Sequence, residues 1–309
     1  MKTLVIGAAI VDMVMQVDRI PKSGEDVIGK DAKVMVGGCA YNVASTMHNL
    51  DCDHDLCVPV GNGLHASIVR KKLLENGYPI LIQDDTDDNG FCLCLVEKNG
   101  ERTFITVQGV EGNFKTSWFD ELDMNDYDNI YLAGYQVCDH NGSVVAQWLR
   151  TLENKTIYFA PGPVICDIDP ETMTQLMKLN PILHLNEKEL FDFTKETDLD
   201  TALHTLYRKN HNLIIVTLGS RGAAYYDGTH TTIIPSVPVN VVDTIGAGDS
   251  HIGAIISGIS KGLSIQDSIK TANKVSACIV GVQGAVITKE DFNKRMEEQQ
   301  NEQIGRAHV

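Results

Sequence analysis

The chain has 309 residues, of which 43% are hydrophobic and 22% charged, as in an ordinary globular protein long enough to bury a large core. Its formal net charge of −15 argues against a nucleic-acid or anionic-membrane partner. The sequence has no apolar run of the roughly 18 residues that a membrane span needs, and Met1-Lys2 leads into a predicted strand without a signal peptide. Its eight scattered cysteines form no C-x-x-C pair and indicate reduced thiols, so we expect a cytoplasmic protein.

An uninterrupted apolar run at residues 3–9 predicts a first parallel strand that is covered on both faces. A dinucleotide-binding domain would place G-x-G-x-x-G directly after this strand, whereas here only Gly7 precedes Asp12. The missing fingerprint argues against a nicotinamide-dependent dehydrogenase. Taken alone, Asp12 is typical of a strand end or a turn.

Two glycines, Gly37 and Gly38, end a short predicted strand and are followed by a helix that contains Asn42. Glycines let a hydroxyl-rich ligand touch the backbone, and an Asn amide can both donate and accept hydrogen bonds toward it. The alternative is purely structural, with a glycine strand end and an Asn in the first helical turn.

A small second sheet is predicted from a hairpin and two earlier strands. Its four segments are residues 14–17, 33–36, 91–96 and 102–107. Asn99-Gly100 at the tip of the hairpin suits a type I′ turn. Arg102 could reach a ligand from this hairpin, although a solvated charge is the commoner role at such a position.

From residue 129 onward, predicted strands alternate with helices, which is typical of a parallel sheet with crossover helices. These strands are residues 129–133, 156–160, 182–185 and 213–218. Further strands are predicted at residues 58–61, 223–226, 231–234 and 237–242. Because open sheets bind ligands at the carboxyl ends of their strands, Gln136 either contacts a ligand or supports the fold.

The most informative stretch is D-T-I-G-A-G-D at residues 243–249, directly before a helix with isoleucines at i, i+3, i+4 and i+7. Free amides and the helix dipole attract an anion to such a turn. Gly246, Ala247 and Gly248 leave no side chain in the way of a phosphate. Asp249, which a phosphate would repel, makes sense as the base that deprotonates an alcohol attacking a γ-phosphate. The alternative is an acidic residue at an ordinary helix start.

Four segments together resemble the ribokinase-like (PfkB) carbohydrate kinase family. They are G-G-x-x-x-N-x-A at 37–44, N-x-x-E at 186–189, T-x-G-x-x-G at 217–222 and D-T-x-G-A-G-D-x-x-x-G-A-I-I at 243–256. The resemblance covers nearly the whole chain. It implies a single kinase domain over residues 1–309, with a three-layer α/β/α core, a mostly parallel central sheet and a small β-sheet lid. The lid would comprise about residues 13–36 and 90–110.

The resemblance also implies a role for each matching residue, with ATP and Mg²⁺ as cofactors. The residues that would hold the sugar are Asp12, Gly37, Gly38, Asn42 and, as a candidate, Gln136. Those that would hold the nucleotide are Asn186, Thr217, Gly219 and Gly222, and Asn273 lies among small residues that could flank an adenine. Asn186 and Glu189 would organise Mg²⁺ and its water, unless they only start a helix. The residues implied for a monovalent cation such as K⁺ are Asp243, Ile245 and Gly284.

We therefore expect ATP-dependent phosphotransfer to a primary hydroxyl of a small sugar or ribonucleoside. The alternatives of the same class are a ribonucleoside kinase of the adenosine- or pseudouridine-kinase type and a sugar-phosphate kinase, which would need a cationic cluster near the acceptor. An alternative of a different class is a catalytically idle sugar or nucleotide sensor. A lid sheet suggests a homodimer. Cys39 stands where ribokinases tend to have Lys, which argues against a strict ribokinase.

Overall fold

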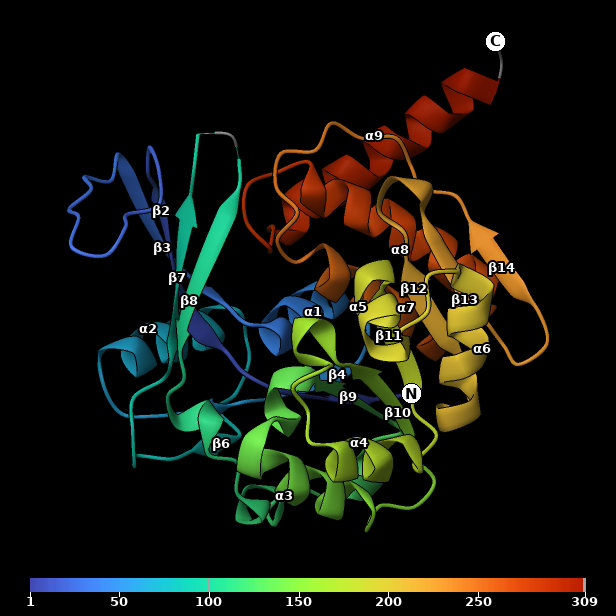
Figure 1. Cartoon of the computed structure of the whole chain (residues 1–309), viewed down its shortest axis with the longest axis horizontal. Coiled ribbons are helices and arrows are strands. Elements are labelled where there is room, and N and C mark those ends of the chain that lie inside the picture. Colours follow the sequence, from blue (N-terminus) through green and yellow to red (C-terminus); the bar gives the residue numbers. More distant parts are fainter. Residues whose placement is uncertain (99, 308–309) are drawn as a thin grey trace.

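The structure is a computed structural model that describes residues 1–98 and 100–307, with the backbone alone for His140 and residues 300–307. An eight-stranded sheet lies at its centre, in the order β14-β13-β12-β11-β10-β9-β1-β4 (Figure 1). Neighbouring strands from β12 to β4 are parallel, and β13 and β14 add an antiparallel edge. The strands are β1 (Thr3–Ile6), β4 (His54–Cys57), β9 (Asn129–Ala133), β10 (Thr156–Ala160), β11 (Ile182–Asn186), β12 (Ile214–Thr217), β13 (Ala223–Tyr226) and β14 (Thr231–Ile234).

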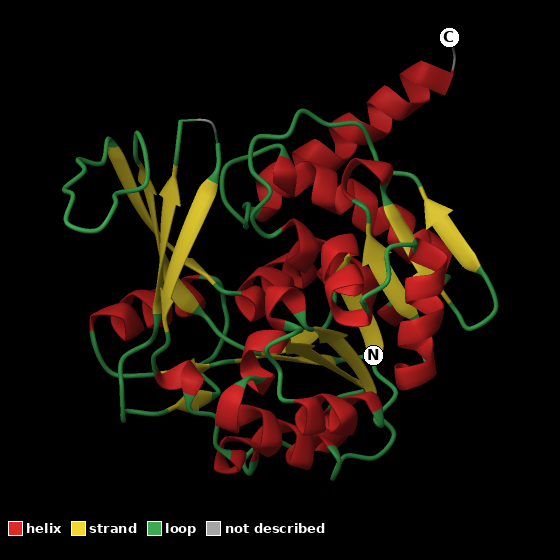
Figure 2. Ribbon diagram, viewed as in Figure 1, coloured by secondary structure: helices red, strands yellow, loops and turns green. Residues whose placement is uncertain are grey.

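Helices cover both faces of this sheet (Figure 2). Successive side chains of a strand point to opposite faces, so the strands contribute to two separate apolar cores, one under each helical layer. In β9, Tyr131 and Ala133 pack toward α1, α7 and α8, whereas Ile130 and Leu132 pack toward α3, α4 and α6. This is the three-layer arrangement that the sequence predicted. The helices are α1 (Cys39–Asn49), α2 (Leu64–Glu75), α3 (Asp139–Leu149), α4 (Pro170–Met177), α5 (Glu187–Thr194), α6 (Leu199–Asn210), α7 (Ala247–Ser260), α8 (Ile265–Val280) and α9 (Lys289–Ala307).

A separate four-stranded sheet stands beside this core in the order β3-β2-β7-β8 (Figures 1 and 2). We call it the small sheet. Its strands are β2 (Ile10–Gln16), β3 (Asp31–Gly37), β7 (Phe91–Val96) and β8 (Arg102–Val107). The predicted second sheet is therefore confirmed, while Asn99 of its predicted turn lies outside the described residues.

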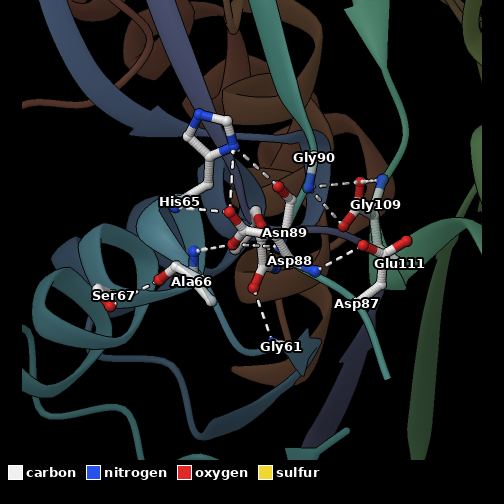
Figure 3. Close-up of polar contacts among 12 residues, drawn as sticks. Gly61, His65, Ala66, Ser67, Asp87, Asp88, Asn89, Gly90, Gly109 and Glu111 are labelled. Atoms are coloured by element: carbon white, nitrogen blue, oxygen red, sulfur yellow. Dashed lines mark hydrogen bonds and ion pairs between the residues drawn. The ribbon is translucent and has the colours of Figure 1, made fainter. Parts of the chain in front are cut away.

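A buried carboxylate fixes the base of the small sheet (Figure 3). Glu111 accepts hydrogen bonds from the N–H of Gly90 at 3.0 Å and of Gly109 at 2.8 Å. Gly90 immediately precedes β7, and Gly109 follows β8 by two residues. Asn89 donates to the carbonyls of Ala9 and Pro59, at 3.1 and 3.0 Å. The hairpin of β7 and β8 therefore rises from an anchored base.

Two predicted strands differ from the structure. Residues 237–242 form no strand, because Pro238 has no N–H to donate and the segment passes the end of α8 instead of another strand. There, the N–H of Val242 donates to the Val280 carbonyl at 2.7 Å. The strand predicted at 58–61 is only β5 (Pro59–Val60), which pairs with β6 (Ile82–Gln83), and the main-sheet strand at this point is β4.

Candidate active site

A cavity of about 350 Å³ opens at the carboxyl ends of the parallel strands. Residues that end or follow four neighbouring strands line it: Gly134 and Tyr135 after β9, Pro161 and Gly162 after β10, Asn186 of β11 and Thr217 of β12. Residues 246–249 of the α7 start close the other side. Open α/β sheets bind ligands at this edge, and the volume falls within the range of about 300–1,000 Å³ that is usual for ligand pockets.

The start of α7 is shaped by Gly246, which has a φ of +73°. A Cβ atom at this position would lie 2.6 Å from the Cβ of Ala285, so only glycine fits both the backbone conformation and the space. At Gly248 a Cβ would meet no atom within 4 Å, which means that this residue borders open space. Amides in the first turn of a helix have no intrahelical partner. The turn therefore presents donors to the cavity, as predicted for an anion site.

Asp249 lies in this first turn and faces the cavity. Its Oδ2 accepts a hydrogen bond from Asn42 Nδ2 at 2.9 Å, and the Cys39 thiol lies close to the same carboxylate. Burial raises the pKa of Asp249 to about 6, and the bonds from Asn42 and Cys39 oppose that rise. The carboxylate is thus ionised at neutral pH, yet its pKa lies near the range that suits a general base.

Asp12 of β2 lies close to the same site. A Cβ atom on Gly37 would fall 1.9 Å from Asp12 Oδ2, so the carboxylate occupies the space directly beside this glycine. Burial, and after it the charge of Asp249, raises the pKa of Asp12 to about 6. Asn42 Oδ1 is buried and has no hydrogen-bond partner among the described residues. Asp12, Gly37 and Asn42, three of the predicted sugar-binding residues, therefore come together, and Asn42 Oδ1 is left without a donor.

Gln136 lies elsewhere. It is buried in the short helix Gly134–Val137, and its Oε1 packs toward Gly7 instead of lining the cavity. Its neighbour Tyr135 lines the cavity and remains 40% exposed. Sequence reasoning missed Tyr135, although its place just after a strand end was a usable signal.

Asn186 and Glu189 both line the cavity and also form a capping box at the start of α5. Asn186 Oδ1 accepts from the N–H of Glu189 at 2.8 Å, and Glu189 Oε2 accepts from the N–H of Asn186 at 2.9 Å. Burial raises the pKa of Glu189. Both alternatives that the sequence left open are thus compatible with the structure. Carboxylate lone pairs remain for a water of Mg²⁺, an ion that needs few protein ligands, so the residues fit it.

The loop after β12 is closed by a hydrogen bond from the N–H of Leu218 to the Gly222 carbonyl at 2.8 Å. Gly219 begins a short helix, Gly219–Arg221, whose backbone has open space at the glycine. The Arg221 guanidinium binds both oxygens of Glu187 at 2.6 Å, so its charge is already paired.

Asn273 belongs to a buried polar chain. Its Nδ2 donates to the carbonyls of Ile234 and Pro235, at 3.2 and 2.9 Å, which leaves Oδ1 facing His251 Nε2 at 3.1 Å. His251 Nε2 must then carry the proton, and its Nδ1 accepts from His184 Nε2 at 2.9 Å. Burial lowers the pKa of both histidines, so both are neutral. No sequence signal linked these two positions, and His184 lines the cavity.

The three residues predicted for a monovalent cation also come together, with a fourth residue beside them. Asp243 is buried, and its Oδ1 accepts a hydrogen bond from the N–H of Ile245 at 2.8 Å and forms an ion pair with Arg102 Nη2 at 3.0 Å. Its Oδ2 accepts from the N–H of Gly284 at 3.0 Å. Arg102 is therefore not the solvated hairpin charge that the sequence favoured. Its side chain is only 18% exposed, because the first residue of β8 faces the core.

The family model described as pfkB family carbohydrate kinase matches residues 2–291. The chain belongs to this family. It is 34% identical over 285 residues to the uncharacterised sugar kinase YegV of Escherichia coli, with coverage of 91% of this chain and 89% of that protein. The protein is therefore a sugar kinase of the PfkB family.

Solved structures show the same fold. A ribokinase of Thermotoga maritima has a TM-score of 0.80 and 21% identity, covering 96% of this chain and 98% of that one. A ribokinase of Arabidopsis thaliana complexed with ribose and ATP has a TM-score of 0.79 and 20% identity, with coverage of 96% and 98%. The ribokinase-like fold predicted from the sequence is confirmed. Among the described residues, every helix is too short or too polar to cross a bilayer.

Proposed function

We propose that this kinase transfers the γ-phosphoryl group of ATP to a primary hydroxyl of a small neutral sugar. The observation that carries the proposal is the Asp249 carboxylate, which faces the cavity from the first turn of α7 and is bonded to Asn42. The N-terminal end of a helix attracts a phosphate, and a carboxylate at that end would repel it. The presence of Asp249 there therefore needs a chemical reason. The ribose and ATP bound to the Arabidopsis thaliana ribokinase support the same assignment.

Asp249 acts as the general base. The acceptor hydroxyl oxygen forms a bond to the γ-phosphorus, its proton passes to Asp249, and the bond from the γ-phosphorus to the bridging oxygen of ADP breaks. The amides of Gly246, Gly248 and Asp249 stabilise the negative charge that develops on the phosphoryl oxygens, whereas the amide of Ala247 already donates to the Thr244 carbonyl at 3.3 Å. Mg²⁺, when bound, neutralises phosphate charge, and Asn186 and Glu189 hold its water.

The nucleotide phosphates lie along the strand ends of the cavity, between the α7 turn and the loop after β12. Thr217 lines this cavity, and the open backbone at Gly219 can approach a phosphate. Gly222 has a φ of +98° and closes the loop. The polar atoms of Asn273 are already engaged by His251 and two carbonyls, so it supports this region without binding the adenine through them.

The acceptor lies between Asp12 and Asn42. The unpartnered Asn42 Oδ1 accepts a hydrogen bond from a sugar hydroxyl, and Asp12 accepts another. The charge here is negative, from Asp12 and Asp249, and the nearby Arg102 is neutralised by Asp243. A phosphate on the acceptor would be repelled, which favours a neutral sugar over a sugar phosphate.

The small sheet acts as a lid over the acceptor. The space on its inner face, lined by Asp12, Gly37 and Phe104, has a volume of about 50 Å³, well below that of usual ligand pockets. A sugar therefore enters only after the lid moves outward, and a ribonucleoside requires a larger movement than a free pentose or hexose. Anchoring by Glu111 keeps the base of the lid in place.

A second copy of the chain covers the outer face of the small sheet. The strand register places Val34, Ile105 and Val107 on the face opposite Asp12, with exposed fractions of 59%, 53% and 46%. Ile105 and Val107 lie on one edge strand and Val34 on the other, with the half-buried Met13 and Leu93 between Val34 and Ile105, so apolar side chains cross the whole width of this face. A row of this kind favours an interface, whereas isolated exposed side chains are ordinary. Light scattering should show a dimer that Ile105→Lys dissociates, whereas Asp200→Lys, an exposed position of α6 away from the small sheet, should leave it intact. A monomeric unmutated protein would contradict this arrangement.

The proposed reaction is tested by measuring ADP release from Mg-ATP with separate panels of pentoses, hexoses, ribonucleosides and sugar phosphates. We expect a neutral pentose or hexose to stimulate turnover. Stimulation by a ribonucleoside alone would replace the proposed acceptor class, and stimulation by a sugar phosphate would contradict the charge argument. ATP binding without turnover on any acceptor would favour the idle sensor.

A further inference from the structure

The carboxylate of Asp243 joins three segments that are far apart in the sequence. It accepts hydrogen bonds from the N–H of Ile245 in the turn before α7 and from the N–H of Gly284 in the loop after α8, and it forms an ion pair with Arg102 in the small sheet. The loop after α8 also touches the α7 turn itself, since Ala285 packs against Gly246. The shape of the anion-binding turn therefore depends on the surroundings of this one carboxylate.

Arg102 reaches Asp243 from the tip of the small sheet. It is the first residue of β8 and pairs with Val96, the last residue of β7, so it lies next to the hairpin turn. Figure 1 shows this hairpin rising beside the loop that follows α8. A second contact bridges the same gap, where Lys33 Nζ of β3 donates to Gln283 Oε1 at 2.7 Å. Both contacts join the small sheet to the loops around the α7 turn.

A buried carboxylate needs a compensating positive charge or several donors. Asp243 has two backbone donors, and the positive charge comes from Arg102 at 3.0 Å. A K⁺ ion on the same carboxylate would lie against the guanidinium, and the two like charges would repel each other. The cation that the family resemblance implied at Asp243, Ile245 and Gly284 therefore does not fit this chain.

We propose that Arg102 is a positioning residue that takes the place of a monovalent cation. Its guanidinium neutralises Asp243 and holds the α7 turn in its anion-binding shape. Because the guanidinium belongs to the small sheet, the turn is fully ordered only when the sheet closes over the acceptor. Arg102 Nε is buried without a hydrogen-bond partner among the described residues, and the guanidinium forms its ion pair with Asp243. This inference rests on the proposed phosphotransfer for its effect on turnover, but not for its effect on cation binding.

The test compares the full-length protein in KCl, NaCl and tetramethylammonium chloride at equal ionic strength. The unmutated protein should have the same turnover within about twofold, and the same melting temperature, in all three salts. Arg102→Ala should lose about 10- to 100-fold in kcat, because the turn is misplaced. KCl should then restore part of the turnover of this variant and raise its melting temperature, and millimolar guanidinium chloride should restore turnover more fully. Arg19→Ala, an exposed arginine in the loop between β2 and β3, serves as the matched control.

Arg102→Gln provides a second variant that keeps an N–H donor in case truncation to Ala prevents folding. Activation of the unmutated protein by K⁺, or a rise of its melting temperature in K⁺ alone, would overturn the proposal. Unchanged turnover of both Arg102 variants in tetramethylammonium chloride would overturn it as well. If no acceptor supports turnover at all, the proposed function fails, whereas the melting temperatures still decide whether Arg102 excludes the cation.

Discussion

Asn42 Nδ2 donates a 2.9 Å hydrogen bond to Asp249 Oδ2 across 207 positions of sequence. The bond ties α1, which carries the proposed acceptor-binding residue, to α7, which carries the proposed base. It also stabilises the ionised form of Asp249. In the proposed reaction, Asn42 thus holds the acceptor beside the base and keeps the base ready to take a proton.

Replacement of Asn42 by Ala should therefore affect both binding and chemistry. We expect the KM for the acceptor to rise, because Oδ1 no longer accepts its hydroxyl, and the pKa of Asp249 to rise, because a donor to the carboxylate is lost. The acidic limb of the rate profile should move to higher pH, as measured by kcat against pH. A change in KM with an unmoved acidic limb would show that the bond to Asp249 does not tune the base.

The unmutated protein should lose activity as the pH falls through about 6. Asp249 accepts a proton only when ionised, and burial places its pKa at about 6, as it does for Asp12. Profiles of kcat/KM should therefore decline below pH 6 with a limiting slope between one and two, since either protonation impairs the free enzyme. Activity that is constant down to pH 4.5 would exclude Asp249 as the base and Asp12 as an ionised acceptor ligand.

The buried, ionised carboxylate of Asp249 should lower the free energy of unfolding at neutral pH. The folded state raises its pKa from 3.8 to about 6, so between these values the folded protein binds more protons than the unfolded chain. Stability therefore falls as the pH rises through this window, and the cost is complete above pH 6. Asp249→Asn should raise the free energy of unfolding by up to about 3 kcal/mol at pH 8, with a gap that closes toward pH 4. Denaturant unfolding measures the free energy of unfolding of both proteins at each pH. The control is Asp200→Asn, a substitution at an exposed position of α6.

The buried histidine chain should produce the opposite dependence. The pKa of His251 falls to about 4 from 6.5, and that of His184 is also lowered. The folded state therefore binds fewer protons than the unfolded chain below pH 6.5, and stability is lost as the pH falls from 6.5 to 4. His251→Gln keeps a donor toward Asn273 and cannot be protonated. Between pH 6.5 and pH 4, the free energy of unfolding should fall less for this variant than for the unmutated protein. The difference should reach up to roughly 3 kcal/mol at pH 4. Equal losses would show that the pair is not buried as a neutral chain.

The parts of the structure that could be predicted from the sequence depend on local pattern. The apolar strands and the small hairpin have the residue pattern that is typical of strands. The glycines at 246–248 indicate a turn with a backbone conformation that other residues rarely adopt. The strand predicted at residues 237–242 was wrong, because their alternating valines lie in an exposed segment that has no partner strand. The two exposed residues Val241 and Val242 show that apolar alternation does not guarantee burial.

Contacts between distant segments could not be predicted in the same way. The ion pair of Arg102 with Asp243 joins the small sheet to the segment before α7, and the hydrogen bond of His184 to His251 joins β11 to α7. Neither pair has a local pattern, because each exists only once the topology has brought two elements together. The direction of the Gln136 side chain could not be predicted either. The residue follows a strand end, where ligands bind, but its side chain points toward Gly7.

The most direct test of general-base catalysis compares Asp249→Asn with the unmutated protein, by kcat with the best acceptor and by the dissociation constant of ATP from calorimetry. We predict a loss of about 10²- to 10⁴-fold in kcat, as expected when a general base is removed, with ATP affinity retained or improved. Asp200→Asn should match the unmutated protein in both quantities. If Asp249→Asn turned over at a rate close to that of the unmutated protein, Asp249 would not be the base.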